Sequence, residues 1–251
     1  MLNIFNNGRN ELDEIAFKEG TDKSRRKHFY TKWYNFYFNS LRHEKINFLE
    51  IGVKWGHSLL TWEKFFTNAT IYGMDLHFLK NKKRDGMPNN IDKKFKIFIG
   101  DSGNKECLRK ICDEVTKGFD IIVDDASHRS NHQIIAFNYL FPRLNPGGIY
   151  VIEDTFLSYN KCFHSKGFLT LMSFLKKRVD DVNFLGKYKW CNYDIIKEKE
   201  KTQEKVRDRR TKKGTTKVKI NEYEDMIEAM HFYNGICFIF KRDEEIVNKK
   251  K

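Results

Sequence analysis

Residues 119–128 of this 251-residue chain read Phe119-Asp-Ile-Ile-Val-Asp124-Asp125-Ala-Ser-His128. The apolar run at the start predicts a short strand buried on both faces, and the two carboxylates mark its end. Two adjacent acids at the end of a core strand repel each other and must be solvated or neutralised. Asp124 and Asp125 therefore indicate a functional site rather than a contribution to stability.

A second apolar strand also ends in two acids. Residues 148–154 read Gly148-Ile-Tyr-Val-Ile-Glu153-Asp154. If the two strands are parallel neighbours, their acids meet at the carboxyl edge of one sheet, where open α/β sheets bind ligands. A divalent cation is the simplest explanation for such a cluster. Two unrelated acidic turns are the alternative.

Three earlier strands are each expected to end near an acid. Their ranges are 46–51, 70–75 and 95–101, with the acids Glu50, Asp75 and Asp101. Gly52 and Gly56 in the turn after the first strand would let a ligand approach the backbone at a helix N-terminus. Asp75 is placed to accept two ribose hydroxyls of a nucleotide-like ligand. The spacing is not Gly-x-Gly-x-x-Gly, which disfavours a nicotinamide cofactor.

The alternation of these strands with helical segments predicts an α/β fold with a Rossmann-like, doubly wound and mostly parallel sheet. Residues 226–240 predict a closing antiparallel hairpin around Asn234-Gly235. We expect a single domain over residues 1–251, with an N-terminal helical segment at 1–43 and a lid or insertion at 155–222.

Two segments need separate expectations. An aromatic-rich helix is expected from about Ser24 to Leu41, mostly for packing but with part of it bordering a pocket. The run 197–219 is dense in Lys, Arg and Glu, and a solvated helix, a flap and a basic arm all remain open for it.

Composition limits the partners and the compartment. With 47 basic and 34 acidic residues the net charge is +13, which suits nucleic acid, an anionic membrane or a phosphorylated small substrate, or reflects compositional drift. The five cysteines form no Cys-x-x-Cys pair, which favours reduced, mostly buried thiols in a cytoplasmic protein. The first ten residues lack the apolar core of a signal peptide, and no apolar run reaches the roughly 20 residues of a membrane helix.

Taken together, the motifs resemble those of class I S-adenosylmethionine-dependent methyltransferases. They are most similar to the metal-dependent sugar O-methyltransferases that modify macrolide glycosides and bacterial surface polysaccharides. The resembling segments span about residues 19–246 and are Gly20-Thr-Asp-Lys23 with His28 and Tyr30, Leu49-Glu-Ile-Gly-Val-x-x-Gly-x-Ser58, Gly73-x-Asp75, Gly100-Asp101, Asp124-Asp-x-Ser-His128, Val151-Ile-Glu-Asp154 and His231-Phe-Tyr-Asn234. The sequence departs from the family at Ala126, where Gly is frequent, and in the run 197–219, which does not align.

This resemblance implies an enzyme that uses S-adenosylmethionine and Mg²⁺. It implies that Asp125, Glu153 and Asp154 hold the metal, and that His128 is the catalytic base beside Asp125. A surface or helix-capping histidine is the alternative for His128. The residues expected to bind the cofactor are Thr21, Lys23, Tyr30, Glu50, Gly52, Gly56, Ser58, Asp75, Leu76, Asp101, Ser102 and Asp124.

The expected reaction is methyl transfer to a sugar hydroxyl, an in-line displacement that depends on positioning and on removal of the hydroxyl proton. The metal edge suits an acceptor with paired oxygens, and the charge of +13 suits a diphosphate. We therefore expect a nucleotide-linked sugar used for capsular polysaccharide, held in part by Lys, Arg and aromatic side chains between 155 and 219. The alternatives are a nucleic-acid methyltransferase and a non-catalytic subunit that binds S-adenosylmethionine. A membrane partner is not expected, nucleic acid is disfavoured, and a homo-oligomer is compatible with the sequence.

Overall fold

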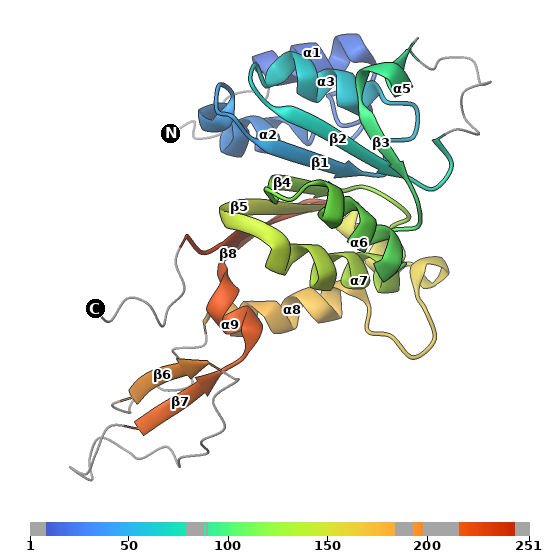
Figure 1. Cartoon of the computed structure of the whole chain (residues 1–251). Helices are drawn as coiled ribbons and strands as arrows, with labels where there is room; N and C mark the ends of the chain where they lie inside the picture. Colours follow the sequence, from blue (N-terminus) through green and yellow to red (C-terminus); the bar gives the residue numbers. More distant parts are fainter. Residues whose placement is uncertain (1–8, 79–87, 89, 184–192, 198–215, 244–251) are drawn as a thin grey trace, which may run out of the picture.

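The fold is built on a seven-stranded sheet in the order β3-β2-β1-β4-β5-β9-β8 (Figure 1). The computed structural model describes residues 9–78, 88, 90–183, 193–197 and 216–243, and for 193–197 and 216–220 the backbone only. The strands are β1 (Asn47–Ile51), β2 (Thr70–Asp75), β3 (Lys96–Ile99), β4 (Phe119–Asp124), β5 (Leu144–Glu153), β8 (Ile227–Tyr233) and β9 (Ile236–Lys241). Strands β1 to β5 pair in parallel, whereas β9 is antiparallel to both β5 and β8. The predicted fold class is confirmed.

Helices cover both faces of the sheet (Figure 1). One face packs on α1 (Glu11–Glu19), α2 (Thr31–Phe38), α3 (His57–Phe65) and the short α5 (Ile91–Lys94). The other face packs on α6 (Lys105–Glu114), α7 (Ser130–Leu140) and α8 (Leu171–Val182). Along β4, Ile121 and Val123 join the first core and Ile122 joins the second, as the period of two in a strand requires. A central strand buried on both faces is what its continuous apolar run predicted.

The closing hairpin is confirmed, and its turn lies beside the acids. Gly235 in the turn between β8 and β9 has φ +80°, the left-handed conformation that this tight turn needs. Its carbonyl accepts a hydrogen bond from the backbone N–H of Thr155 at 3.0 Å. The turn is thereby attached to the residue that follows Asp154.

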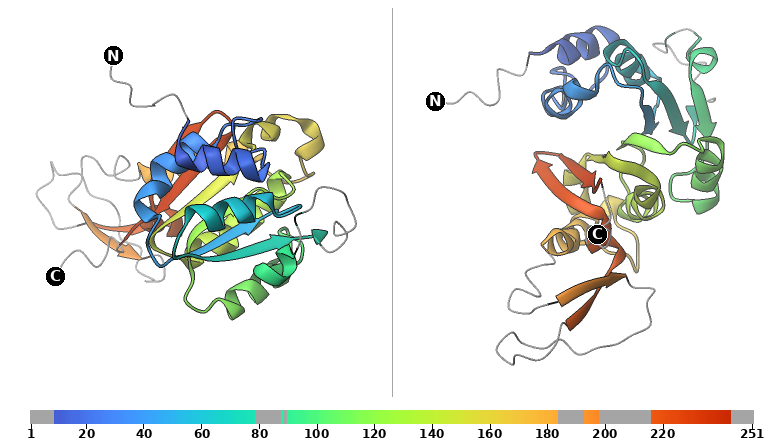
Figure 2. Two further views of the ribbon diagram at one scale, coloured as in Figure 1. Left: turned by 90° about the horizontal axis from the view of Figure 1, so that it is seen from above. Right: turned by 60° about the vertical axis from the view of Figure 1, so that its left-hand side comes forward.

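The segment 155–222 contains short helices, one longer helix and a small separate sheet. It holds η3 (Thr155–Tyr159), η4 (Lys161–Phe163), α8, and the parallel pair β6 (Tyr193–Lys197) and β7 (Thr216–Ile220). Figure 1 and the right-hand view of Figure 2 show this pair extending away from the main sheet, near α9 (Glu222–Met226). Most of the charged run 197–219 lies outside the described residues, so the three interpretations of it stay predictions.

The aromatic helix expected from Ser24 is shorter than predicted. It begins at Thr31, and η1 (Asn39–Leu41) continues it. Before it the chain forms turns, within which the Ser24 hydroxyl donates to the carbonyl of Thr21 at 2.8 Å. Such local side-chain bonds compete with helix formation.

The cysteines also depart from expectation. Those described are free, but only Cys237 is buried; Cys107 and Cys112 are half-buried, and Cys162 is exposed. Cys191 lies outside the described residues. Among the helices that the structure describes, none is both long enough and apolar enough to cross a bilayer.

Gly52, which follows β1, is required by the sheet itself. A Cβ atom at this position would lie 2.1 Å from the carbonyl oxygen of Asp125, and the φ of Gly52 is +93°. The sequence suggested that this glycine makes room for a ligand. The structure shows that it also makes room for the backbone that follows β4, so the turns after β1 and β4 touch at the carboxyl edge.

We expect Gly52→Ala to lower the free energy of unfolding by at least about 3 kcal/mol, because backbone strain and a backbone clash add. Gly167→Ala is the matched control, since Gly167 also has a positive φ, +81°, but no atom lies within 4 Å of its added Cβ. That variant should lose only about 1 kcal/mol. Urea unfolding of the two variants measures the difference. Equal losses would show that the contact with Asp125 imposes no constraint.

Candidate active site

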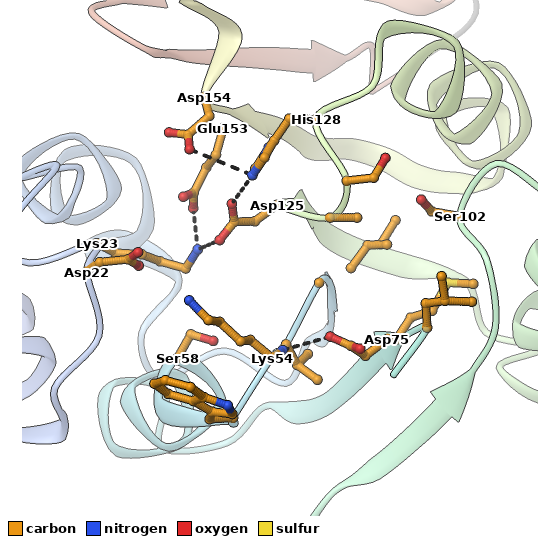
Figure 3. Close-up of a pocket in the computed structure, with 18 of the residues that line it drawn as sticks. Asp22, Lys23, Lys54, Ser58, Asp75, Ser102, Asp125, His128, Glu153 and Asp154 are labelled. Atoms are coloured by element: carbon orange, nitrogen blue, oxygen red, sulfur yellow. Dashed lines mark hydrogen bonds and ion pairs between the residues drawn. The ribbon is translucent and has the colours of Figure 1, made fainter. Parts of the chain in front are cut away.

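A cavity of about 1030 Å³ opens at the carboxyl edge of the parallel strands. Ligands bind at this edge in open α/β sheets, beside the point where the strand order reverses. Here the reversal falls between β1 and β4, which pair although they are distant in sequence. The cavity wall includes the turn after β1, the ends of β2 and β3, and the acids that follow β4 and β5 (Figure 3).

His128 and two acids converge at one end of this cavity. Asp125 follows β4, Asp154 follows β5, and His128 precedes α7 with a left-handed φ of +56°. The Nε2 atom of His128 lies 3.8 Å from Oδ1 of Asp125 and 3.7 Å from Oδ2 of Asp154 (Figure 3). Among the described residues these three offer ligand atoms within 4.8 Å of one another, close enough to share one metal ion.

A buried lysine from the N-terminal segment lies among the acids. Lys23 is 2% exposed, and its Nζ lies 2.5 Å from Asp125 Oδ2, 2.8 Å from Glu153 Oε1 and 3.3 Å from Glu50 Oε1 (Figure 3). Burial alone would lower the pKa of Lys23, but the three carboxylates raise it well above its usual value. The sequence suggested Lys23 as a cofactor residue. It lines the cavity, yet its ammonium is directed at the acids.

Two tyrosines of the same segment also donate to these acids. The Tyr34 hydroxyl donates to Oε1 of Glu153, and the Tyr30 hydroxyl donates to Oδ1 of Asp154 at 2.7 Å. Burial, and then the adjoining acid, raises the pKa of both phenols, so each retains its proton and can donate. The aromatic stripe was expected to border a pocket, but nothing in the sequence paired a given tyrosine with a given acid.

The donors at this end fit a divalent cation. Glu50 and Glu153 are at most 2% exposed. Lys23 contributes one positive charge, whereas Glu50, Glu153, Asp125 and the nearby Asp154 are four carboxyl groups. Burial and then the proximity of Asp125 raise the pKa of Glu153 well above its usual value, so a cation bound nearby would favour its ionised form. Several carboxylate oxygens with excess negative charge are the environment that Mg²⁺ prefers.

The other end of the cavity carries Asp75 and Asp101. The Asp75 carboxylate accepts backbone N–H groups of Lys54 at 2.8 Å and His77 at 2.7 Å, which fixes its orientation. Asp101 Oδ1 lies 3.3 Å from Nδ1 of His132, which projects from the first turn of α7. The sequence did not single out His132. A helical segment after the strand that ends in Asp124 and Asp125, as the alternation of strands and helices predicts, could have pointed to it, since the first turn of that helix lies at this edge.

Most of the suggested site residues line the cavity. They are Thr21, Lys23, Gly52, Ser58, Asp75, Leu76, Asp101 and Ser102, together with Asp125, His128, Glu153 and Asp154.

Four suggested cofactor residues do not line it, and their role toward the cofactor stays a prediction. Glu50 is fully buried and accepts a hydrogen bond from Ser58 at 2.6 Å, and Tyr30 bonds Asp154 instead. Gly56 faces Ile91, and Asp124 lies under the cavity near the hydroxyl of Tyr150. In each case a neighbouring part of the protein contacts the polar group or occupies the open space.

Comparisons with known proteins agree with this geometry. The chain is 34% identical over 182 residues to 8-demethyl-8-alpha-L-rhamnosyl tetracenomycin-C 2'-O-methyltransferase of Streptomyces olivaceus, covering 68% of this chain and 46% of that protein. It is 34% identical over 156 residues to mycinamicin VI 2''-O-methyltransferase of Micromonospora griseorubida, covering 59% of this chain and 37% of that protein. No family model matches the chain.

Among solved structures, the MycE methyltransferase of the mycinamycin pathway, in complex with Mg, SAH and mycinamycin VI, aligns with 95% of this chain at a TM-score of 0.67 and 25% identity. The alignment covers 56% of that protein. The chain therefore spans about half the length of the relatives it matches. The strand order, the cavity at the carboxyl edge and these similarities show that the chain belongs to the class I S-adenosylmethionine-dependent methyltransferases. Within that class its relatives are sugar O-methyltransferases.

The buried Asp124 should make stability depend on pH. Burial and then the neighbouring Asp125 raise its pKa from 3.8 to about 7, although the N–H of Ala126 partly opposes this. The folded protein thus keeps a proton that the unfolded chain releases, so stability falls as the pH rises from about 4 to 7. A pKa difference of about 3 corresponds to about 4 kcal/mol.

We therefore expect Asp124→Asn to remove much of this decline, measured by urea unfolding from pH 4 to 8 without metal. The comparison is with the unmodified protein, because other acids titrate in the same interval. Parallel pH profiles for the two proteins would show that folding does not raise the pKa of Asp124.

Proposed function

We propose that this chain is a Mg²⁺-dependent O-methyltransferase that moves a methyl group from S-adenosylmethionine to a sugar hydroxyl. The observation that carries the proposal is the convergence of His128 with Asp125 and Asp154 beside a cavity large enough for cofactor and acceptor. A non-catalytic subunit would have no need of a histidine and several acids gathered in this way.

The two ends of the cavity would have different roles, one in binding the cofactor and the other in holding the metal. Asp75 would accept hydrogen bonds from the ribose hydroxyls of the cofactor. Asp101 and Ser102 would lie near the adenine of the cofactor. Asp125, Glu153 and Asp154 would hold Mg²⁺, which lowers the pKa of a coordinated hydroxyl. The Nε2 atom of His128 would take the proton of the acceptor, and the two carboxylates at 3.8 and 3.7 Å would stabilise the resulting imidazolium.

For the acceptor we propose a nucleotide-linked sugar, used for a surface polysaccharide. The support is electrostatic: the chain carries a net charge of +13, and Lys27 and Lys54 line the cavity. Basic side chains can bind a diphosphate through charge-assisted hydrogen bonds. Of the segment 155–219 that we expect to cover it, residues 184–192 and 198–215 lie outside the described part of the chain.

A second acceptor is a sugar attached to an apolar aglycone. Phe156 and Tyr159, which follow Asp154 in η3, are 45% and 69% exposed. Exposed aromatic side chains beside a polar site suit an amphipathic ligand. The relatives named above act, by their names, on glycosylated tetracenomycin and mycinamicin. These observations support a glycoside as the second candidate acceptor and do not bear on the polysaccharide.

A panel of acceptors tests the function. We expect labelled methyl transfer from S-adenosylmethionine to nucleotide-linked hexoses, with no transfer to RNA or DNA. Transfer should stop in EDTA and return with Mg²⁺, because the acids need the cation to act on the hydroxyl.

Macrolide and aromatic polyketide glycosides form the second arm of this panel. Methylation of these alone would assign the apolar acceptor. Methylated nucleic acid without methylated sugar, or full activity in chelator, would contradict the proposal.

His128→Ala should lower kcat by roughly 10² to 10⁴, the usual loss when a general base is removed. Cofactor affinity, measured by calorimetry, should be nearly unchanged, because the histidine lies at the metal end of the cavity. His132→Ala is a useful comparison at the other end, where Asp101 is its partner. A change confined to KM in His128→Ala would make His128 a substrate-positioning residue.

A further inference from the structure

Each expected metal ligand has one oxygen bound by the segment 20–34. Lys23 binds Oδ2 of Asp125 and Oε1 of Glu153, at 2.5 and 2.8 Å. The hydroxyl of Tyr34 donates to the same Oε1, and that of Tyr30 donates to Oδ1 of Asp154 at 2.7 Å. One continuous stretch of chain thus contacts all three acids.

The opposite oxygens point elsewhere. Oδ1 of Asp125 and Oδ2 of Asp154 are the atoms that face Nε2 of His128, at 3.8 and 3.7 Å. The two aspartates are therefore oriented alike, with one oxygen toward the N-terminal segment and one toward the histidine. In Glu153, the Oε1 atom accepts hydrogen bonds from both Lys23 and Tyr34.

The donors themselves are held firmly. Lys23, Tyr30 and Tyr34 are each at most 2% exposed. The Tyr34 ring packs edge-on against Trp62 and Phe238, with centroids 5.0 and 5.5 Å apart. Buried, close-packed side chains keep one rotamer, so the acid oxygens that they bind are not free to rotate.

We propose that Lys23, Tyr30 and Tyr34 are positioning residues that restrict these acids to one-oxygen ligation and thereby select Mg²⁺ over Ca²⁺. The inference rests on the proposed metal site. Mg²⁺ takes near-ideal octahedral geometry, whereas Ca²⁺ accepts six to eight oxygens and readily binds both oxygens of a carboxylate. A carboxylate with one oxygen already hydrogen-bonded offers its other oxygen only, so it does not readily bind Ca²⁺ through both. Outer groups of this kind alter metal affinity by roughly 10- to 100-fold.

The test is metal binding by the full chain, without acceptor. Calorimetry with Mg²⁺ alone and with Ca²⁺ alone gives the ratio of the two affinities for Tyr30→Phe and Tyr34→Phe. Each variant removes one hydroxyl and keeps the ring, so the packing survives. We expect the preference for Mg²⁺ to fall about 10-fold in Tyr30→Phe. The fall should be smaller in Tyr34→Phe, because Lys23 still binds Oε1 of Glu153.

Tyr37→Phe is the matched control. Its hydroxyl bonds Tyr233 at 2.5 Å and His231 at 2.6 Å, away from the acids, so the ratio should not change. The inference is overturned if the first two variants keep the ratio of the unmodified protein, or if they lose both ions in parallel, as general loosening would cause. An unmodified protein that binds neither ion would overturn the metal-dependent function itself. Mg²⁺-dependent methyl transfer together with an unchanged ratio would remove the inference alone.

Discussion

One buried ammonium group among carboxylates determines the layout of this site. Lys23 contacts Glu50 from β1, Asp125 after β4 and Glu153 from β5, and so connects three adjacent strands at their carboxyl ends. Buried charges are tolerated only when they are paired, because the loss of hydration exceeds what an isolated charge can recover. The lysine compensates part of the acid cluster, and the remaining negative charge is what a divalent cation would bind.

This interaction also joins the N-terminal segment to the sheet. The turns between α1 and α2 place the lysine over the sheet edge, and Tyr30 and Tyr34 donate hydrogen bonds to the two acids at the end of β5. The hairpin turn contributes from the other side, since the carbonyl of Gly235 lies 3.1 Å from the Tyr30 hydroxyl. The metal end of the cavity is therefore enclosed by both terminal parts of the domain, although its acids come from the middle of the sequence.

The sequence by itself determined the fold and the edge of the sheet at which the candidate site lies. Apolar runs that end in acids predicted where the parallel strands lie along the chain. Asn234-Gly235 predicted the hairpin. The acids at Asp125, Glu153 and Asp154 could be placed together because parallel strands share a carboxyl edge. These inferences succeeded because they depend on local periodicity and on a rule of topology, neither of which requires knowledge of side-chain packing.

Tertiary structure alone decided which groups those acids meet. The pairing of Lys23 with Glu153 joins residues 130 positions apart, and no periodic pattern encodes such a contact. The same holds for Gly52, whose close neighbour is the backbone of Asp125, and for His132, which reaches Asp101 from the start of α7. Whether a polar side chain faces a ligand or supports another residue depends on distances across strands. Those distances are set only when the sheet and its helices pack together.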